Sequence, residues 1–143
     1  MEKAAVLTVE KLTELLGREF SEAFHPDGGL SILQVRYGGA RVRQEYQKNA
    51  TRPGGTLSGP VIMQLADVTA YVAILASIGW VPLAVTTSLN INFLKKPPPR
   101  ALIGEGRLIK LGKRLAVAEI DIRSEAEPDL VAHATSTYSI PPW

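Results

Sequence analysis

One carboxylate lies inside the most apolar stretch of the chain. Residues 61–79 read VIMQLADVTAYVAILASIG, and Asp67 is the only charged residue among them. An ionised carboxylate that leaves water without a partner costs several kcal/mol, so Asp67 is the first candidate for a general base or a nucleophile. The alternative is a structural acid that pairs with Gln64, Thr69 or a residue of a partner chain.

Ser58, Gly59 and Pro60 come directly before this stretch. A serine at the start of a helix is typical of an N-cap, which can be its only role. Otherwise its hydroxyl can orient a water molecule or a carbonyl group. Gly59, in the first helical turn, can present a free backbone N–H and the positive end of the helix dipole to an oxyanion.

The chain has two histidines, His25 and His133, and no cysteine. No nucleophile-elbow pattern surrounds Ser58, which argues against a Ser–His–Asp triad. Neither histidine has an acidic neighbour at ligand spacing, so no catalytic metal and no cofactor is expected. Without cysteine there is no disulfide framework, no thiol nucleophile and no thiolate metal site.

Apolar periodicity predicts the elements that must position these groups. Thr8 can cap a helix that runs to about Phe24, and a long helix begins near Ser58 after the loop 49–57. Two strands, 30–37 and 40–47, are joined as a hairpin at Gly38 and Gly39. Four more are expected at 84–94, 102–111, 115–123 and 130–140. Strands grouped in runs imply an α+β fold whose curved antiparallel sheet wraps one long central helix, with an additional N-terminal helix.

Size and composition restrict the class of protein. A chain of 143 residues with 45% hydrophobic and 21% charged residues is typical of one globular domain, here residues 1–143. No export signal is visible, and a cytoplasmic location is expected. Gln64, Asp67 and Thr69 argue against a membrane span. One sheet leaves part of so apolar a helix uncovered, which predicts a partner subunit.

Basic residues gather between Lys95 and Arg114, where seven lysines and arginines stand against one acid, Glu105. Such a stretch suits an anionic partner, and phosphates are the usual one. The alternative is an exposed strand edge whose charges deter aggregation.

Four motifs carry a resemblance to a known family. They are GGTLSGPVIMQLADVTAYVA, AVTTSLNINFLKKP, GEGRLIKLGKRLAVAEIDI and LVAHATSTYSI, from Gly54 to about Tyr138. Together they resemble the hotdog-fold thioesterases of the phenylacetic-acid-degradation (PaaI-like) type. In that family a His-Gly-Gly loop leads into the central helix, and an aspartate nine residues after the histidine acts on an acyl-CoA thioester. Asp67 lies nine residues after Ser58 and matches that aspartate.

The loop departs from the family pattern. Ser58 stands in place of the histidine, Gly59 keeps the first glycine, Pro60 replaces the second, and Arg52 stands where many members have asparagine. Thr86 matches a serine or threonine near the reacting centre. The resemblance implies the catalytic set Asp67, Gly59, Ser58 and Thr86, and the substrate-binding set Arg52, Gln64, Lys113, Arg114, Lys95 and Lys96. It also implies an acyl tunnel beside the helix, with Met63, Tyr71, Ile91 and Phe93 as lining residues.

The expected function is hydrolysis of an aryl- or fatty-acyl-CoA, with active sites shared between subunits of a homodimer or homotetramer. A protein that holds acyl-CoA with weak or no hydrolysis is the main alternative, because the family histidine and asparagine are missing. A dehydratase or isomerase would require a histidine near the helix acid. Nucleic-acid binding is disfavoured because no aromatic residues are interleaved with the basic ones.

Overall fold

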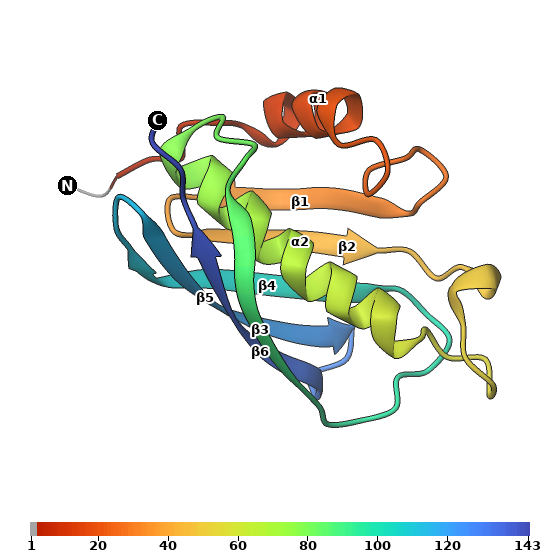
Figure 1. Cartoon of the computed structure of the whole chain (residues 1–143). Coiled ribbons are helices and arrows are strands. Elements are labelled where there is room, and N and C mark those ends of the chain that lie inside the picture. Colours follow the sequence, from red (N-terminus) through yellow and green to blue (C-terminus); the bar gives the residue numbers. More distant parts are fainter. Residues whose placement is uncertain (1–2) are drawn as a thin grey trace.

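The computed structural model describes residues 3–143. Its elements are α1 (Val9–Glu19), β1 (Leu30–Arg36), β2 (Gly39–Gln44), the short 3₁₀ helix η1 (Lys48–Ala50), α2 (Gly59–Ile78), β3 (Val85–Phe93), β4 (Leu102–Leu111), β5 (Leu115–Ser124) and β6 (Leu130–Ser139). The six strands form one antiparallel sheet in the order β1-β2-β4-β5-β6-β3. Figure 1 shows this sheet curving around α2, which confirms the hotdog fold expected from the sequence.

The central helix is buried because strands approach it closely. Most of α2 from Ile62 to Ser77 is inaccessible to solvent. Two glycines of β4 allow the approach: a Cβ added to Gly106 would lie 2.9 Å from Thr69 Cγ2, and one added to Gly104 would lie 2.5 Å from Thr69 Oγ1. By length and a mean hydropathy of 1.8, α2 meets the criteria for a membrane span, yet 72% of that window is buried inside the protein. A core helix explains both properties.

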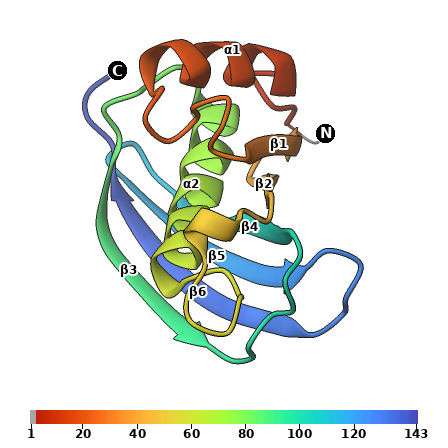
Figure 2. The same cartoon turned by 90° about the vertical axis from the view of Figure 1, so that its right-hand side faces the viewer.

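The first helix lies across the C-terminal end of α2 (Figure 2). Thr8 caps it as expected, since its Oγ1 accepts a hydrogen bond from the Lys11 N–H at 3.1 Å. Leu12, Leu15 and Leu16 are buried. The helix ends at Glu19, earlier than the expected Phe24, because Phe20 leaves the helical conformation at φ −136° and ψ 50°.

The strand boundaries agree with the sequence prediction except in the hairpin. Arg36 pairs with Gly39, so the two-residue turn is Tyr37–Gly38 and not Gly38–Gly39. Gly38 adopts a positive φ of 80°, which glycine reaches without steric cost. β2 ends at Gln44, three residues earlier than expected.

Candidate active site

Two hydroxyl groups hold the carboxylate of Asp67. Its Oδ1 accepts a hydrogen bond of 2.6 Å from Thr86 Oγ1 and one of 2.7 Å from the Tyr138 hydroxyl. The Asp67 side chain is half-buried at this point of α2. The alternative prediction that Asp67 pairs with Gln64 or Thr69 is wrong. Gln64 is exposed, and the Thr69 hydroxyl donates to the carbonyl oxygen of Leu65 at 2.6 Å.

The pairing of β3 with β6 places both donors. Thr86, at the start of β3, is the cross-strand partner of Tyr138, near the end of β6. The register shifts between Thr86 and Ser88. Side chains of a regular strand alternate between faces, so this bulge allows both Thr86 and Leu89 to face the core, three positions apart. Thr86 therefore reaches Asp67.

Tyr138 is a functional candidate that the sequence analysis missed. Burial raises the pKa of the Tyr138 hydroxyl far above its usual value, and the nearby Asp67 carboxylate raises that pKa further. The hydroxyl therefore stays protonated and remains a donor. The available signal was the alternation along β6, which puts Ala132, Ala134, Ser136 and Tyr138 on the buried face.

Asp67, Thr86 and Tyr138 share the wall of a cavity of about 420 Å³. The rest of the wall is mainly apolar and comes from the end of α1, from α2 and from the segment before β3. Of the expected tunnel residues, Tyr71 lines this cavity, whereas Met63, Ile91 and Phe93 do not. The cavity can therefore hold an apolar group next to a fixed carboxylate.

A second cavity, of about 460 Å³, lies at the N-terminal end of α2. It brings together Arg52, Gly59, Lys95 and Lys96. The Lys96 ammonium lies over the preceding loop, 3.0 Å from where a Cβ on Gly54 would be. Lys95 also pairs with Asp129 at 3.2 Å.

Ser58 occupies the N-cap position with extended backbone, but its side chain makes no capping hydrogen bond. The expected position is confirmed and the expected capping bond is absent. Within the described residues 3–143 its hydroxyl has no hydrogen-bond partner. It is half-exposed directly before Gly59, so it remains available to a ligand.

Gly59 and Asp67 do not meet within one chain. They are separated by eight residues, which is about 12 Å along a helix axis, and they line different cavities. The exposed Gln64 lies outside both cavities.

Lys113 and Arg114 lie in the β4–β5 turn, away from both cavities. Lys113 lines a third hollow at the C-terminal end of α2, beside Ser77 and Ile78. Other members of the basic stretch are neutralised by acids from elsewhere: Arg100 pairs with Glu127 at 3.3 Å, and Arg107 pairs with Glu119. The stretch is therefore divided in space and less basic than its sequence indicates.

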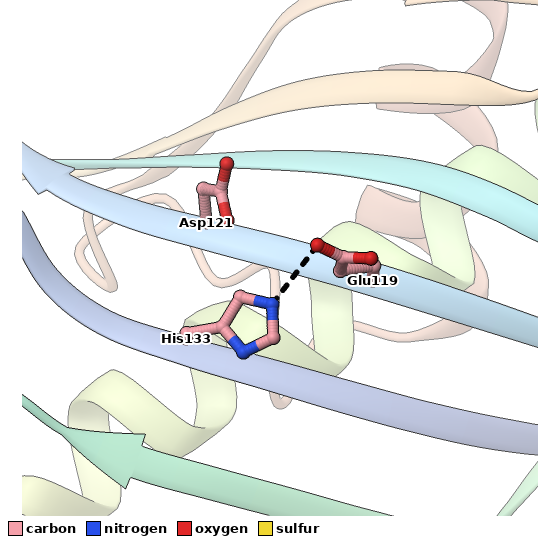
Figure 3. Close-up of side chains that lie close together, drawn as sticks. All are labelled: Glu119, Asp121 and His133. Atoms are coloured by element: carbon pink, nitrogen blue, oxygen red, sulfur yellow. Dashed lines mark hydrogen bonds and ion pairs between the residues drawn. The ribbon is translucent and has the colours of Figure 1, made fainter.

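Strand pairing also gives His133 acidic neighbours that its sequence context does not show. His133 Nε2 lies 3.0 Å from Glu119 Oε1, and Asp121 is the cross-strand partner of His133 (Figure 3). The three side chains could approach one cation, since their ligand atoms lie within 4.8 Å of one another. However, Arg107 pairs with both acids and Arg123 pairs with Asp121. These guanidinium groups already supply the positive charge, so the cluster serves as an ion-pair network on the sheet face opposite α2.

Comparisons with known proteins agree with the fold. A sequence profile described as the thioesterase superfamily matches residues 54–131. A predicted esterase of Saccharolobus solfataricus is 31% identical over 135 residues, which cover 94% of this chain and 87% of the relative. A crystal structure of a predicted thioesterase from Silicibacter is 41% identical, with a TM-score of 0.87 over 96% of this chain and 94% of that one. A variant of the phenylacetic acid degradation protein PaaI from Thermus thermophilus shares the fold at 24% identity, with a TM-score of 0.71 over 82% of this chain and 98% of that one.

Proposed function

Because the chain belongs to the thioesterase superfamily, we propose that it hydrolyses an acyl-CoA thioester and that Asp67 is its general base or nucleophile. One observation carries the proposal: a carboxylate fixed by Thr86 and Tyr138 forms part of the wall of an apolar cavity. Both hydrogen bonds go to Oδ1, and Oδ2 has no partner among residues 3–143. The free oxygen is the atom that would act.

As a general base, Asp67 Oδ2 takes a proton from water while the water oxygen attacks the thioester carbonyl carbon. The tetrahedral intermediate then collapses, the C–S bond breaks, and the proton passes to the thiolate of coenzyme A. As a nucleophile, Oδ2 forms the C–O bond itself, coenzyme A leaves, and water hydrolyses the resulting anhydride. Hydrolysis in ¹⁸O-labelled water under single-turnover conditions tests the second route. Label in the Asp67 carboxylate would show that water attacked the Asp67 carbonyl carbon of an anhydride, which the general-base route cannot produce.

The developing oxyanion requires a donor, and Gly59 is our candidate. Its N–H belongs to the first turn of α2, where the helix dipole is positive. One such donor is worth roughly 10² to 10³ in rate. The coenzyme A phosphates would contact Arg52, Lys95 and Lys96 in the cavity that Gly59 also lines.

A second copy of the chain would bring Gly59 to Asp67. β3 is an edge strand, and apolar side chains on and beside it are open to solvent: Leu83, Val85, Phe93 and Leu94 are 51–78% exposed. An unpaired apolar edge favours pairing with another strand. We therefore place a homodimer interface at β3, with Asp67 of one subunit completed by Gly59 of the partner subunit; a tetramer would add a second interface.

The test is thiol release from aryl- and fatty-acyl-CoA substrates by wild type, Asp67→Asn and the control Asp27→Asn. Asp27 lies in an exposed turn with a side chain 93% exposed. Wild type and the control should turn over, and Asp67→Asn should lose activity by at least about 10². If acyl-CoA raised the melting temperature of the wild type without any product, the protein would be an acyl-CoA-binding protein. Turnover that survives in Asp67→Asn would remove Asp67 from the mechanism.

A further inference from the structure

Aromatic residues are concentrated at the cavity beside Asp67. The chain has nine aromatic residues other than histidine, namely two Trp, four Tyr and three Phe. Four of them, Phe20, Tyr71, Trp80 and Tyr138, line this one cavity. A wall of rings is the surface expected for an apolar group that must be held in a defined orientation.

Three of these rings form a continuous column that ends at the carboxylate. The Phe20 ring meets Tyr71 edge to face with centroids 6.0 Å apart, and Tyr71 stacks on Tyr138 at 6.1 Å. Tyr138 then donates its hydrogen bond to Asp67. Phe20 is therefore the member of the column farthest from the reacting carboxylate.

The position of Phe20 is fixed by α1. Its N–H donates to the carbonyl oxygen of Leu16 at 2.8 Å, at the end of a helix anchored by buried leucines. The Tyr71 hydroxyl donates to the Pro82 carbonyl oxygen at 2.7 Å, which fixes the opposite ring and the segment before β3. The end of the cavity is thus built from two restrained elements.

The size and charge of the cavity restrict its occupant. Its volume of about 420 Å³ lies toward the small end of ligand cavities, which span roughly 300 to 1,000 Å³. Among residues 3–143, its charged lining residues are two carboxylates, Glu19 and Asp67, and none of the lysines, arginines and histidines of this range lines it. A negatively charged acyl group would be repelled.

We infer that Phe20 closes the far end of the acyl cavity and restricts the substrate to compact, uncharged acyl groups, namely short chains or a single ring. The inference rests on the proposed function only in placing the acyl group beside Asp67. Phe20 is a specificity-determining residue: it acts through the length of the cavity and not through the reacting atoms.

The test measures binding of S-alkyl coenzyme A thioethers, which have no carbonyl to attack and cannot be hydrolysed. Calorimetric affinities are compared for the butyl, hexyl, octyl, decyl, dodecyl, benzyl and 5-carboxypentyl compounds with wild type, Phe20→Ala and the control Phe24→Ala. Phe24 neighbours Phe20, with ring centroids 6.4 Å apart, but does not line the cavity. Phe20 is 42% exposed, so its truncation should leave the fold intact.

The wild type and Phe24→Ala should bind the hexyl and benzyl compounds best and lose affinity for longer chains and for the carboxypentyl compound. Phe20→Ala should bind the dodecyl compound roughly tenfold more tightly than wild type does. Equal length profiles in wild type and Phe20→Ala, or tight dodecyl binding by wild type, would overturn the inference. Because binding is measured without turnover, an inactive wild type that still shows the predicted length profile would refute hydrolysis and leave this inference standing.

Discussion

The Tyr138 hydroxyl lies 2.7 Å from Asp67 Oδ1 and 3.0 Å from the carbonyl oxygen of the same residue, although 71 positions separate the two in sequence. The contact joins β6, the last strand along the chain, to the central helix α2. It explains how a carboxylate is tolerated in an otherwise apolar helix, because the charged oxygen receives donors that replace water.

Replacing Tyr138 by Phe should lower kcat roughly 10- to 100-fold. A hydrogen bond to a charged group contributes about 1.5 to 3 kcal/mol, and each 1.36 kcal/mol corresponds to tenfold in rate. The ring that stacks on Tyr71 stays, so the near-ultraviolet circular dichroism should be preserved. The measurement is kcat from steady-state kinetics, and the near-ultraviolet circular dichroism spectrum is the control for an intact fold. A variant with wild-type kcat would show that the Tyr138 bond supports the fold alone.

The contribution of Thr86 to kcat should depend on its hydroxyl group and not on the shape of its side chain. Thr86→Val removes the second donor to Asp67 Oδ1 and should lower kcat, whereas Thr86→Ser keeps the donor and should restore most of it. Both donors serve one oxygen, so the loss in Thr86→Val combined with Tyr138→Phe should differ from the sum of the two single losses. Equal activities for the Val and Ser variants would contradict the role of the hydroxyl.

Arg52 and Lys96 should affect binding of the coenzyme A portion of the substrate. Their replacement by Ala should raise KM for acyl-CoA roughly 1.4- to fivefold each, the range of an exposed ion pair of about 0.2 to 1 kcal/mol. KM for the corresponding N-acetylcysteamine thioester, which has no phosphates, should not change. Lys110→Ala, at an exposed lysine of β4, is the control. Lys113→Ala and Arg114→Ala in the same assay would show whether the β4–β5 turn of any subunit reaches the phosphates.

A charge placed on the β3 edge should dissociate the proposed dimer and inactivate it. Asn90 is exposed near the middle of β3, so two lysines from Asn90→Lys would meet if the strand pairs with its own copy. Gln34→Lys is the matched control, because β1 is the other edge of the sheet. For Asn90→Lys only, the sedimentation coefficient and the rate of thiol release should both fall. An Asn90→Lys variant that is monomeric and fully active would show that one chain contains a complete site.

The ion-pair network on the opposite sheet face should contribute stability above about pH 4.5. The hydrogen bond from His133 holds the pKa of Glu119 below its usual value of 4.5, and the Arg107 charge lowers it further. A lowered folded-state pKa stabilises the protein above the unfolded-state pKa, and this contribution is lost as the pH falls through the folded-state value.

Glu119→Gln should therefore lower the melting temperature at pH 7, and the difference from wild type should shrink toward pH 3. Glu22→Gln, at an exposed position in the segment after α1, should show no such pH dependence. A constant difference for Glu119→Gln at all pH values would mean that packing, and not charge, is responsible.

The sequence by itself determined the central helix, the order of the helices and strands along the chain, and the position of Asp67. The helix and the strands follow from local patterns, namely an apolar run with one acid and apolar alternation bounded by turn residues. The spacing of nine residues between Ser58 and Asp67 was informative because it matches the pattern of the family that the sequence resembles. Thr86 was also found, because it lies at a fixed place in a motif of the first strand after the helix.

Only the tertiary structure decided what surrounds Asp67. The Tyr138 hydrogen bond, the wall that Phe20 builds from α1, the separation of Gly59 from Asp67 and the acidic neighbours of His133 all depend on strand register or on helix docking. A strand register is set by pairing between residues far apart in the chain, and a one-residue shift would turn each side chain to the other face. Local pattern cannot encode such contacts, so the position of Asp67 was readable from the sequence and its surroundings were not.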